Sequence, residues 1–286
     1  MTVLVNGQPS TTVSANDRGL LYGQTLFETI AVVNAQPRLL EAHLQRLEAS
    51  TKSLLIPLNI NNIDSDIEVI SDFFNASHNA VLRVTISMGS GGRGYANPEL
   101  PSVTRIVSLH DYPKHPAKLA THGITLGLSP VKLAQQPLLA GLKHGNRLEQ
   151  VMARSQWQTD WNEALLCDQS DNVIEGTQSN IVVLKGDQAL SPKLDQCGVE
   201  GVMKGWVLSQ LKDAGFSCRA VRLSLQDIIE ADEVMLTNSV IGIWPVKTFH
   251  CKGTAHSFVI DKPSGALNTA QRLIEQLHQN EIIPPN

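Results

Sequence analysis

Hydrophobic and polar residues in the first part of the chain follow two different periods. Apolar runs of strand length predict strands at 3–5, 26–33, 81–87 and 103–109, and the first run is followed by the turn dipeptide Asn6-Gly7. Between the second and third runs the period becomes helical, with leucines at Leu40, Leu44, Leu47, Leu54 and Leu55. A shorter helix is expected at 64–74. These elements predict a small α/β domain over residues 1–113.

Polar residues without a clear period make up the segment 114–123, which is predicted to link two domains. Beyond it, strands are expected at 124–128, in a hairpin-like pair over 163–184, and at 233–236, and helices at 147–158, 202–214 and 265–279. The predicted fold class is therefore α/β (α+β), with a small N-terminal domain and a larger C-terminal domain over residues 124–286.

The composition is that of a folded globular protein, with 42% hydrophobic and 17% charged residues in a chain of 286. Twenty-three Lys and Arg against 27 Asp and Glu give a net charge of -4. This balance argues against a nucleic-acid-binding protein, which usually carries a basic face. An anionic small-molecule substrate would then be bound by a few local cations rather than by the overall field.

The four cysteines lie far apart and form no Cys-x-x-Cys pair: Cys167, Cys197, Cys218 and Cys251. This spacing is typical of reduced thiols in a cytoplasmic protein. The first 18 residues lack the features of a signal peptide, and no apolar stretch approaches the roughly 20 residues of a membrane span. We therefore expect a cytoplasmic protein that does not bind a membrane. No metal site is expected, because His110, Asp111 and His115 lie in a polar connecting segment.

Residues 89–94 match the pattern G-x-G-x-x-G directly after a predicted strand. A dinucleotide site with this pattern needs a helix to begin at the glycines, so that free backbone N–H groups meet the pyrophosphate. The segment that follows, 95–101, contains two prolines, which prevent such a helix. The glycines instead indicate a mobile loop that carries one exposed arginine, Arg93.

Lys143 is the first candidate for chemistry. It lies among small and apolar residues in the segment 140–146, where lost solvation would favour the neutral, nucleophilic amine. Taken alone, a lysine is more often a solvated surface charge. The surrounding sequence therefore makes Lys143 a candidate and no more.

Four further patterns are also weak when each is taken alone. Glu175 opens a turn that runs to Ser179-Asn180, and Gly201-Val202-Met203 opens a helix whose free N–H groups could receive a phosphate. Thr237-Asn238-Ser239 ends a strand, and Arg46 projects from the first long helix. An ordinary turn, helix start, strand end or solvated arginine would look the same.

Their order and spacing together resemble the fold-type-IV (class IV) pyridoxal-phosphate enzymes. This family contains branched-chain aminotransferases, D-amino-acid aminotransferases and 4-amino-4-deoxychorismate lyases. Five segments match the family pattern in order: His43-x-x-Arg46-Leu47, Lys143 before His144 and Asn146, Glu175 with Ser179-Asn180, Gly201-Val202-Met203, and Thr237-Asn238-Ser239. The resemblance covers nearly the whole chain, from Asn6-Gly7 to about Val246.

The resemblance implies a role for each matched residue. Lys143 would hold pyridoxal 5'-phosphate as a Schiff base and then move the proton, and Glu175 would keep the pyridine nitrogen protonated. Ser179 and Asn180 would belong to the same cofactor site. The phosphate would be bound by Arg46, the backbone N–H groups of Val202 and Met203, Asn238 and Ser239. The family fold also implies a homodimer, with the active site between the domains.

Within the family, the segments 89–95 and 141–151 resemble the aminodeoxychorismate lyases most closely. D-amino-acid aminotransferases carry Arg-x-His where this chain has Arg93-Gly94-Tyr95, so Tyr95 departs from their pattern. Phe27-Glu28 also occurs in the aminotransferases, and other lyases of the subgroup carry threonine in place of Glu28. Arg93 is the first candidate for binding a substrate carboxylate, Tyr95 lies beside it, and Arg105 on a predicted strand is the second candidate.

The expected reaction is conversion of 4-amino-4-deoxychorismate to 4-aminobenzoate and pyruvate, a step of folate biosynthesis, by a carbon–oxygen lyase. Two alternatives stay open. One is a D-amino-acid or branched-chain aminotransferase on the same scaffold, and the other is a protein that binds pyridoxal phosphate without turnover. Arg93 and Tyr95 on a glycine-rich loop favour catalysis over binding alone.

Overall fold

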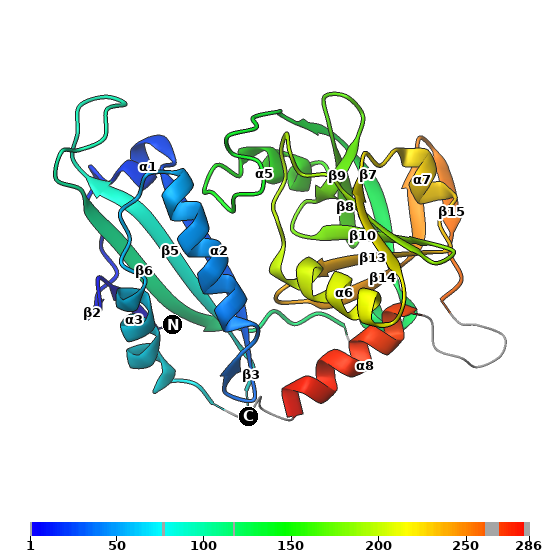
Figure 1. The fold of residues 1–286 in the computed structure, drawn as a ribbon, viewed down its shortest axis with the longest axis horizontal. Coiled ribbons are helices and arrows are strands. Elements are labelled where there is room, and N and C mark those ends of the chain that lie inside the picture. The colour runs from blue at the N-terminus through cyan, green and yellow to red at the C-terminus, as the bar shows by residue number, and fades with distance from the viewer. Residues whose placement is uncertain (1, 76–77, 117, 261–268, 283–286) are drawn as a thin grey trace. The chain divides into compact units, whose positions relative to one another are not determined.

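The computed structural model describes residues 2–75, 78–116, 118–260 and 269–282. The chain divides into two compact units (Figure 1). The first comprises Met1–Pro113 together with Leu142–Asn146, and the second comprises Lys114–Gly141 together with Arg147–Asn286. A mixed α/β fold with a smaller N-terminal and a larger C-terminal part is thus confirmed.

The first unit is built on a six-stranded antiparallel sheet with the strand order β2-β1-β6-β5-β3-β4. Its strands are β1 (Thr2–Val5), β2 (Gln8–Pro9), β3 (Thr25–Val33), β4 (Gln36–Pro37), β5 (Ala80–Ser90) and β6 (Ser102–Asp111). Its helices are α1 (Arg18–Tyr22), α2 (Leu40–Ser53) and α3 (Asn61–Ser71).

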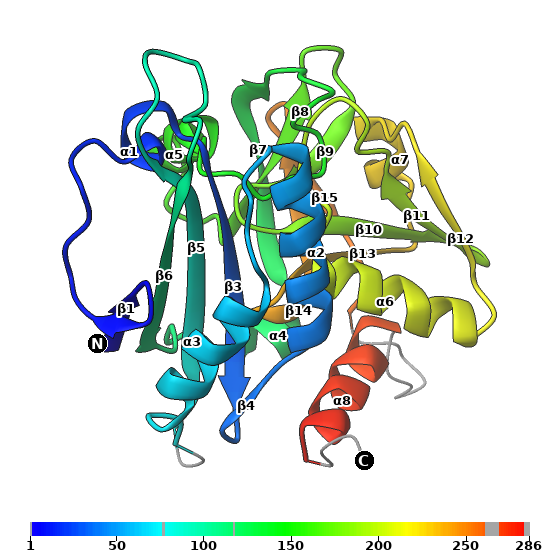
Figure 2. The ribbon, with the colours of Figure 1, turned by 60° about the vertical axis from the view of Figure 1, so that its left-hand side comes forward.

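One face of this sheet is covered by α2 and α3 (Figure 2). On β3 every second side chain from Leu26 to Ile30 is buried, as the period of a strand requires. This alternation directs Glu28, between Leu26 and Ile30, toward the apolar core that contains Leu47 of α2. A carboxylate is therefore placed in a hydrophobic interior, and its partners decide whether the fold can tolerate it.

Leu142–Asn146 belongs to the first unit because it extends along β3. The Phe27 N–H donates to the Lys143 carbonyl (3.0 Å), and the Gly145 N–H donates to the Thr25 carbonyl (2.9 Å). The predicted domain limits, with a linker at 114–123, do not separate this short segment from the second domain. Lys143 is thus carried by backbone pairing with a strand that lies more than 100 residues earlier in the chain.

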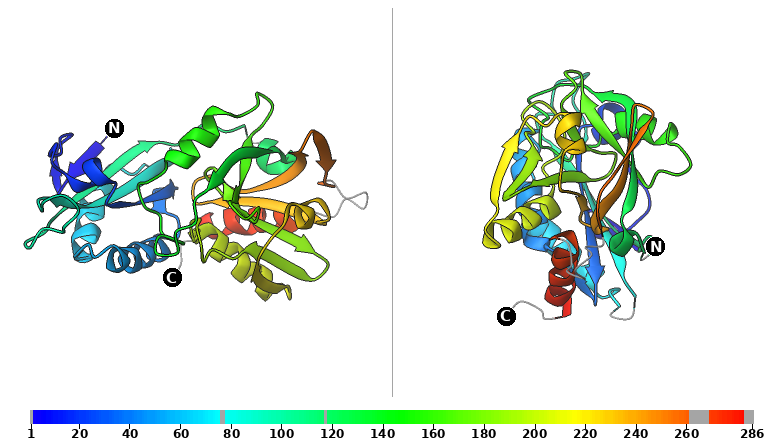
Figure 3. Two further views of the ribbon diagram at one scale, coloured as in Figure 1. Left: turned by 90° about the horizontal axis from the view of Figure 1, so that it is seen from above. Right: turned by 90° about the vertical axis from the view of Figure 1, so that its right-hand side faces the viewer.

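The second unit is built on a large mixed sheet (Figure 3). Its nine strands have the order β12-β11-β10-β13-β14-β7-β8-β9, and β15 pairs with β14. The strands are β7 (Ile124–Leu133), β8 (Glu163–Asp168), β9 (Val173–Gly176), β10 (Asn180–Lys185), β11 (Gln188–Pro192), β12 (Ser217–Val221), β13 (Glu233–Asn238), β14 (Gly242–Cys251) and β15 (Thr254–Ser257). The pairs β7–β8, β7–β14 and β11–β12 are parallel.

Within the described residues of this unit, five helices accompany the sheet: α4 (Lys118–His122), α5 (Leu148–Ser155), α6 (Val202–Asp213), α7 (Leu225–Ile229) and α8 (Thr269–Ile282). The core gathers apolar residues of β7, β8, β10, β13 and β14, with Phe249 among the largest buried side chains. None of the helices in the described part of the chain is long and apolar enough to cross a membrane.

Most predicted elements are present, with shifted ends. The helix expected at 64–74 begins earlier, at Asn61, and the helix expected at 147–158 is the shorter α5. The segment predicted as a linker contains the helix α4, so it is not irregular throughout. The helix expected at 265–279 is observed from Thr269, and its expected start lies outside the described residues. As predicted, no helix begins after the glycines of 89–94.

Candidate active site

In the first unit, Glu28 on β3 is the centre of a buried polar cluster. Its Oε1 accepts from Arg46 Nε (2.8 Å), and its Oε2 accepts from Arg46 Nη2 and from His43 Nδ1 (2.6 Å). His43 and Arg46 are three residues apart on α2, so both face the sheet from the same side of the helix. The two residues of the matched motif His43-x-x-Arg46 therefore both bind the carboxylate of Glu28, a contact that the sequence did not predict.

The charges in this cluster follow from burial and pairing. Burial alone would raise the pKa of Glu28, but the hydrogen bonds from His43 and Arg46 outweigh it and hold that pKa below its usual range. Burial lowers the pKa of His43 more than Glu28 raises it, so the imidazole is neutral near pH 7. His43 Nδ1 then carries the proton that it donates to Glu28. Its Nε2 is a buried acceptor with no hydrogen-bond partner among the described residues.

Arg46 is held by Glu28 in a two-point contact. Its side chain is 13% exposed, and the carboxylate fixes the plane of the guanidinium. The role expected for Arg46, a contact with the cofactor phosphate, would use the guanidinium in the orientation that Glu28 imposes. The Glu28–Arg46 pair is consequently a buried ion pair and not a surface one.

Lys143 is half-buried, and its ammonium nitrogen lies 4.5 Å from the centroid of the Phe27 ring. Phe27 is also the residue whose N–H binds the Lys143 carbonyl, so one strand position supports both the backbone and the side chain of the lysine. The positive charge of Lys143 contributes to the lowered pKa of His43. Lys143 and the Glu28 cluster are therefore electrostatically coupled within the first unit.

Arg93 and Tyr95 lie on the loop of residues 91–101 between β5 and β6. The Arg93 side chain is exposed and makes no ion pair or hydrogen bond with the described residues. This loop was expected to be mobile. In the structure the Arg18 side chain donates to three backbone carbonyls of the loop. Sequence reasoning missed Arg18, because nothing in the pattern Asp17-Arg18-Gly19 points to the loop 75 residues away.

Arg105, the second candidate for a substrate carboxylate, is paired inside the first unit. Its Nε donates to Asp66 Oδ2 at 2.8 Å, and the two side chains are 16% and 5% exposed. Asp66 belongs to α3 and Arg105 to β6, so the ion pair fastens this helix to the sheet. This pairing engages the Arg105 guanidinium, so Arg93 stays the first candidate for binding a substrate carboxylate.

In the second unit, Glu175 ends up buried on β9. Its Oε2 accepts from the Val199 N–H (2.8 Å), and Gln150 Nε2 lies 3.4 Å from its Oε1. Val199 also forms a bridge with Gly141, two residues before Lys143 in the chain. A second hydrogen bond, from Asn180 Nδ2 to the Val199 carbonyl (2.8 Å), fixes the next peptide group of the same residue.

Glu163, which the sequence analysis did not single out, organises the turn that follows Glu175. Its carboxylate is fully buried and accepts from the N–H groups of Ala164, Thr177 and Gln178 and from the hydroxyls of Thr177 (2.6 Å) and Ser179 (2.9 Å). Burial raises the pKa of Glu163 despite these donors. An acidic residue at the start of the buried apolar run Ala164–Cys167 was the signal that could have revealed it.

The predicted cofactor residues Ser179, Asn180 and Asn238 are brought together around this turn. The Ser179 hydroxyl is donated to Glu163, and the Asn238 amide donates to the Gln178 carbonyl (3.0 Å). Asn180 lies opposite Thr237 in the β10–β13 pair. The Asn180 and Asn238 amides thus bond to backbone carbonyls and the Ser179 hydroxyl to the Glu163 carboxylate, which favours a supporting role for these three side chains.

The N-terminus of α6 supplies the candidate anion site. Gly201 is its N-cap residue and provides no side-chain acceptor, so the N–H groups of the first turn, at Val202 and Met203, lack the usual cap. A Cβ at Gly201 would lie 1.7 Å from Asn180 Oδ1, which leaves room only for glycine. The helix α6 has twelve residues, and its start has no side-chain cap. Its first N–H groups and its dipole therefore suit a phosphate.

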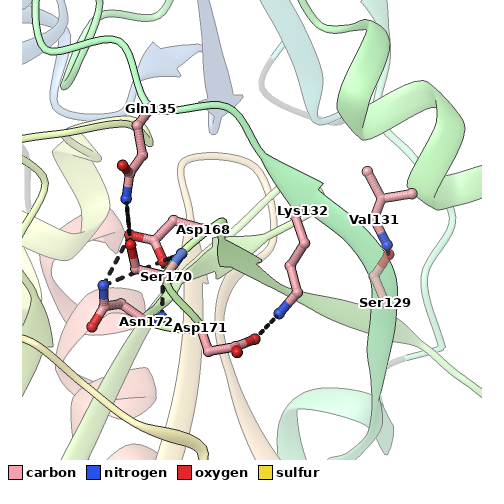
Figure 4. Close-up of polar contacts among 8 residues, drawn as sticks. All are labelled: Ser129, Val131, Lys132, Gln135, Asp168, Ser170, Asp171 and Asn172. Atoms are coloured by element: carbon pink, nitrogen blue, oxygen red, sulfur yellow. Dashed lines mark hydrogen bonds and ion pairs between the residues drawn. The ribbon is translucent and has the colours of Figure 1, made fainter.

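A hub around Asp168 fixes the turn between β8 and β9 (Figure 4). Asp168 accepts from Gln135, from the N–H groups of Ser170 and Asn172, and from the Asn172 amide. Beside it, Lys132 forms an ion pair with Asp171. Burial would raise the pKa of Asp168, but the bonds from Asn172 and Gln135 hold it below its usual range. The hub ties the end of β7 to the turn that leads into Glu175.

The four cysteines are free thiols. Burial raises the pKa of Cys167 to about 11 and that of Cys197 to about 12. Cys197 lies two residues before Val199, close enough for the Glu175 charge to act on it. Both thiols are therefore protonated near neutral pH and are not activated as nucleophiles.

The residues present fit pyridoxal phosphate in three respects. The uncapped start of α6 suits the phosphate, the buried Glu175 carboxylate suits a protonated ring nitrogen, and Lys143 offers a half-buried primary amine for the aldehyde. Each of these groups is held by neighbours in its own unit. The donor set is thus consistent with the cofactor that the sequence pattern implies.

Comparison with known proteins agrees with this donor set. A family model described as amino-transferase class IV matches residues 25–249, and the chain belongs to this family. It is 34% identical to the aminodeoxychorismate lyase of Vibrio harveyi over 274 residues, which cover 93% of this chain and 99% of that protein.

Solved structures give the same picture. The 4-amino-4-deoxychorismate lyase of Pseudomonas aeruginosa matches with a TM-score of 0.88 and 37% identity over 97% of this chain and 98% of that one. A hypothetical aminotransferase of Mycobacterium tuberculosis, solved with alpha-ketoglutarate and PMP bound, shares the fold with a TM-score of 0.80 and 19% identity, covering 99% of each chain.

Replacing Glu28 or Glu163 by glutamine is expected to change the pH dependence of the unfolding free energy in opposite directions. The folded pKa of Glu28 lies below the unfolded value of 4.5, so its stabilisation is present above pH 4.5 and lost as the pH falls through the folded pKa. The stability difference between wild type and Glu28→Gln should therefore grow as the pH rises toward 4.5.

For Glu163 the folded pKa lies above 4.5, so the folded state binds the proton more tightly and loses stability as the pH rises from 4.5. The difference between wild type and Glu163→Gln should then shrink over that range. Urea unfolding of the cofactor-free proteins from acid to neutral pH measures both differences. Differences that run parallel for the two variants would contradict these charge assignments.

Proposed function

We propose that the protein is a pyridoxal-phosphate-dependent lyase that converts 4-amino-4-deoxychorismate to 4-aminobenzoate and pyruvate. The observation that carries this proposal is the similarity to two aminodeoxychorismate lyases over almost the whole of both chains, at 34% and 37% identity. The buried Glu175, the half-buried Lys143 and the uncapped start of α6 support it independently.

Each cofactor-binding role rests on a group that this chain holds in place. The N–H groups of Val202 and Met203 would bind the phosphate, and Arg46, oriented by Glu28, would be its side-chain partner. Glu175 would accept a hydrogen bond from the ring nitrogen and keep it protonated. When bound, pyridoxal phosphate supplies an electron-accepting ring that stabilises negative charge on the carbon bearing the substrate amine.

Lys143 acts on the substrate as well as on the cofactor. Its Nζ would act as a general base and remove the proton from the ring carbon that bears the amine. The neighbouring carbon–oxygen bond would break with aromatisation of the ring, and the enolpyruvyl group would leave as the enolate of pyruvate, which takes up one proton to give pyruvate. Aromatisation makes the elimination strongly downhill, so the protein contributes mainly positioning and proton transfer.

Arg93 binds a carboxylate of the substrate in this proposal. Its side chain is exposed and makes no ion pair or hydrogen bond with the described residues, so a bidentate contact is open to it. The substrate carries two carboxylates, and a chain with a net charge of -4 needs local cations to attract them. Tyr95, two residues further along the same loop, lies beside this contact in sequence.

Mixing the purified, cofactor-loaded protein with 4-amino-4-deoxychorismate is expected to release 4-aminobenzoate and an equal amount of pyruvate. The fluorescence of 4-aminobenzoate measures the reaction. Lys143→Ala should lower the rate at least about 100-fold, because the proton-moving amine is lost. Lys185→Ala is the matched control, since that exposed lysine pairs with Glu230 away from the candidate residues.

No product from wild-type protein that still binds the cofactor would sink the lyase assignment. The same protein would then be given D-alanine or leucine without a keto acid. An aminotransferase would convert its cofactor to the pyridoxamine form in one turnover, whereas a lyase returns it to the aldehyde form in each cycle. The two readouts separate the lyase from the aminotransferase on the same scaffold.

We also propose that the protein works in the cytoplasm as a homodimer. Exposed apolar residues support self-association, with Leu20 of α1 at 69% and Leu148 of α5 at 71% exposure. The free, protonated thiols suit a reducing compartment. Light scattering should give twice the chain mass of 31.1 kDa, and cell fractionation should recover the protein with the cytosol. A monomer mass, or recovery with membranes, would contradict the respective assignment.

A further inference from the structure

Arg18 is a buried cation under the loop of residues 91–101. Only 3% of the residue is exposed, and its Cζ lies 4.8 Å from the centroid of the Tyr22 ring. Its Nε donates to Gln24 Oε1 (2.6 Å), which fixes the guanidinium plane. Burying a charged side chain is unfavourable unless its donors are satisfied. The remaining hydrogen bonds of Arg18 therefore indicate its role.

Those contacts all go to backbone carbonyls of the loop. Nη1 donates to the Gly94 carbonyl (3.0 Å) and the Gly91 carbonyl (3.4 Å), and Nη2 donates to the Tyr95 carbonyl (3.2 Å). The three acceptors span the two residues on either side of Arg93. One guanidinium thus fixes the backbone on both sides of the exposed arginine.

The loop is shaped to fit this cation. Gly92 has a φ of +76°, and a Cβ there would lie 2.3 Å from the Ala96 carbonyl and 3.1 Å from Arg18 Nη1. Glycine adopts this left-handed conformation without steric cost, and it alone leaves this space. The close approach of Gly92 to Arg18 lets the neighbouring carbonyls reach the guanidinium.

Two further contacts connect the same part of the chain to the loop. Gln24 Nε2 donates to Asn97 Oδ1 (3.0 Å), and the rings of Tyr22 and Tyr95 meet edge to face at 5.5 Å. Asp17, beside Arg18, accepts from Ser87 (2.7 Å) and so anchors the start of α1 on β5. Residues 17–24 therefore form a brace between the sheet and the loop, and we call them the α1 brace.

We propose that Arg18 is a positioning residue for substrate binding, which holds the 91–101 loop so that Arg93 is presented in a fixed place to a carboxylate. The inference rests on the proposed function for the role of Arg93. The contact between Arg18 and the loop is observed in the structure and does not depend on the proposed function. Arg18 itself touches no substrate in this account; it acts through the backbone of the loop.

The chemistry requires arginine and not merely a positive charge. The guanidinium presents its donors as a rigid planar fork, which reaches carbonyls at separated positions at the same time. A lysine ammonium is a single point on a flexible stem and cannot span Gly91, Gly94 and Tyr95. Arg18→Lys therefore keeps the charge and removes the geometry, which separates the two contributions.

The test uses trypsin, which cuts after Arg93 when the loop opens. A second cut, after the exposed Lys252 in the β14–β15 turn of the second unit, serves as an internal reference. In the cofactor-loaded protein, Arg18→Lys and Arg18→Gln should each raise the ratio of the Arg93 cut to the Lys252 cut about tenfold, because local opening becomes easier. Arg222→Lys, at an exposed arginine paired with Asp195, should leave the ratio unchanged.

Kinetics with 4-amino-4-deoxychorismate complete the test. Both Arg18 variants should raise KM about tenfold with little change in kcat, since the lost interaction orders the binding loop before the reaction begins. If the Arg18 variants do not fold, Gly92→Ala perturbs the same contact from the loop side and should raise both the cleavage ratio and KM.

The outcomes separate the two claims. An unchanged cleavage ratio in folded Arg18 variants would overturn the inference that Arg18 holds the loop. A raised ratio with an unchanged KM would overturn the link between this loop and substrate binding. Wild-type protein without lyase activity would overturn the proposed function alone, and the cleavage ratio would still decide whether Arg18 holds the loop.

Discussion

A carboxylate taken out of water must be given hydrogen-bond donors, and this requirement shapes the candidate site in both units. Glu28 and Glu163 are each almost completely buried. Glu28 takes its donors from His43 and Arg46 of one helix, and Glu163 takes four of its five donors from the turn of residues 177–179. Because an unsatisfied buried charge would cost several kcal/mol, the partners cannot move far without unfolding their surroundings. The functional side chains therefore have defined positions before any ligand binds.

The two buried carboxylates, Glu28 and Glu163, differ in the charge of the groups that surround them. Glu28 is paired with the cation Arg46, so their charges largely cancel. Glu163 accepts from five N–H and O–H donors of neutral groups, and these do not outweigh its burial, which raises its pKa. The turn it organises also carries Glu175. In the proposed function, the carboxylate of Glu175 favours a protonated ring nitrogen, which is the state that an electron-accepting cofactor needs.

The sequence could predict the elements that depend on local periodicity. The alternation in β3 and β5 and the leucine stripe of α2 are visible as patterns, because burial of one face sets their period. The prolines at 95–101 excluded a helix after the glycines for an equally local reason. The segments with Lys143, Glu175 and Gly201–Met203 could also be recognised in the sequence, because they follow one another in the order of the family pattern.

What the sequence could not predict depends on contacts between distant segments. Nothing near Lys143 shows that it pairs with β3, and nothing near Arg18 shows that it holds the loop around Arg93. Glu163 and Asp168 flank an apolar run and look like ordinary strand ends until the hydrogen bonds are seen. Ser179 and Asn180 were expected at the cofactor, whereas their observed bonds go to Glu163 and to the Val199 carbonyl.

The central claim is that Lys143 is the residue that binds pyridoxal phosphate covalently. Reduction of the cofactor-loaded protein with borohydride, followed by digestion and mass spectrometry, tests it directly. The account predicts one peptide with the added mass of the reduced cofactor, and the modified residue in it is Lys143. A label on another lysine, or no label in protein that retains the cofactor, would contradict the account.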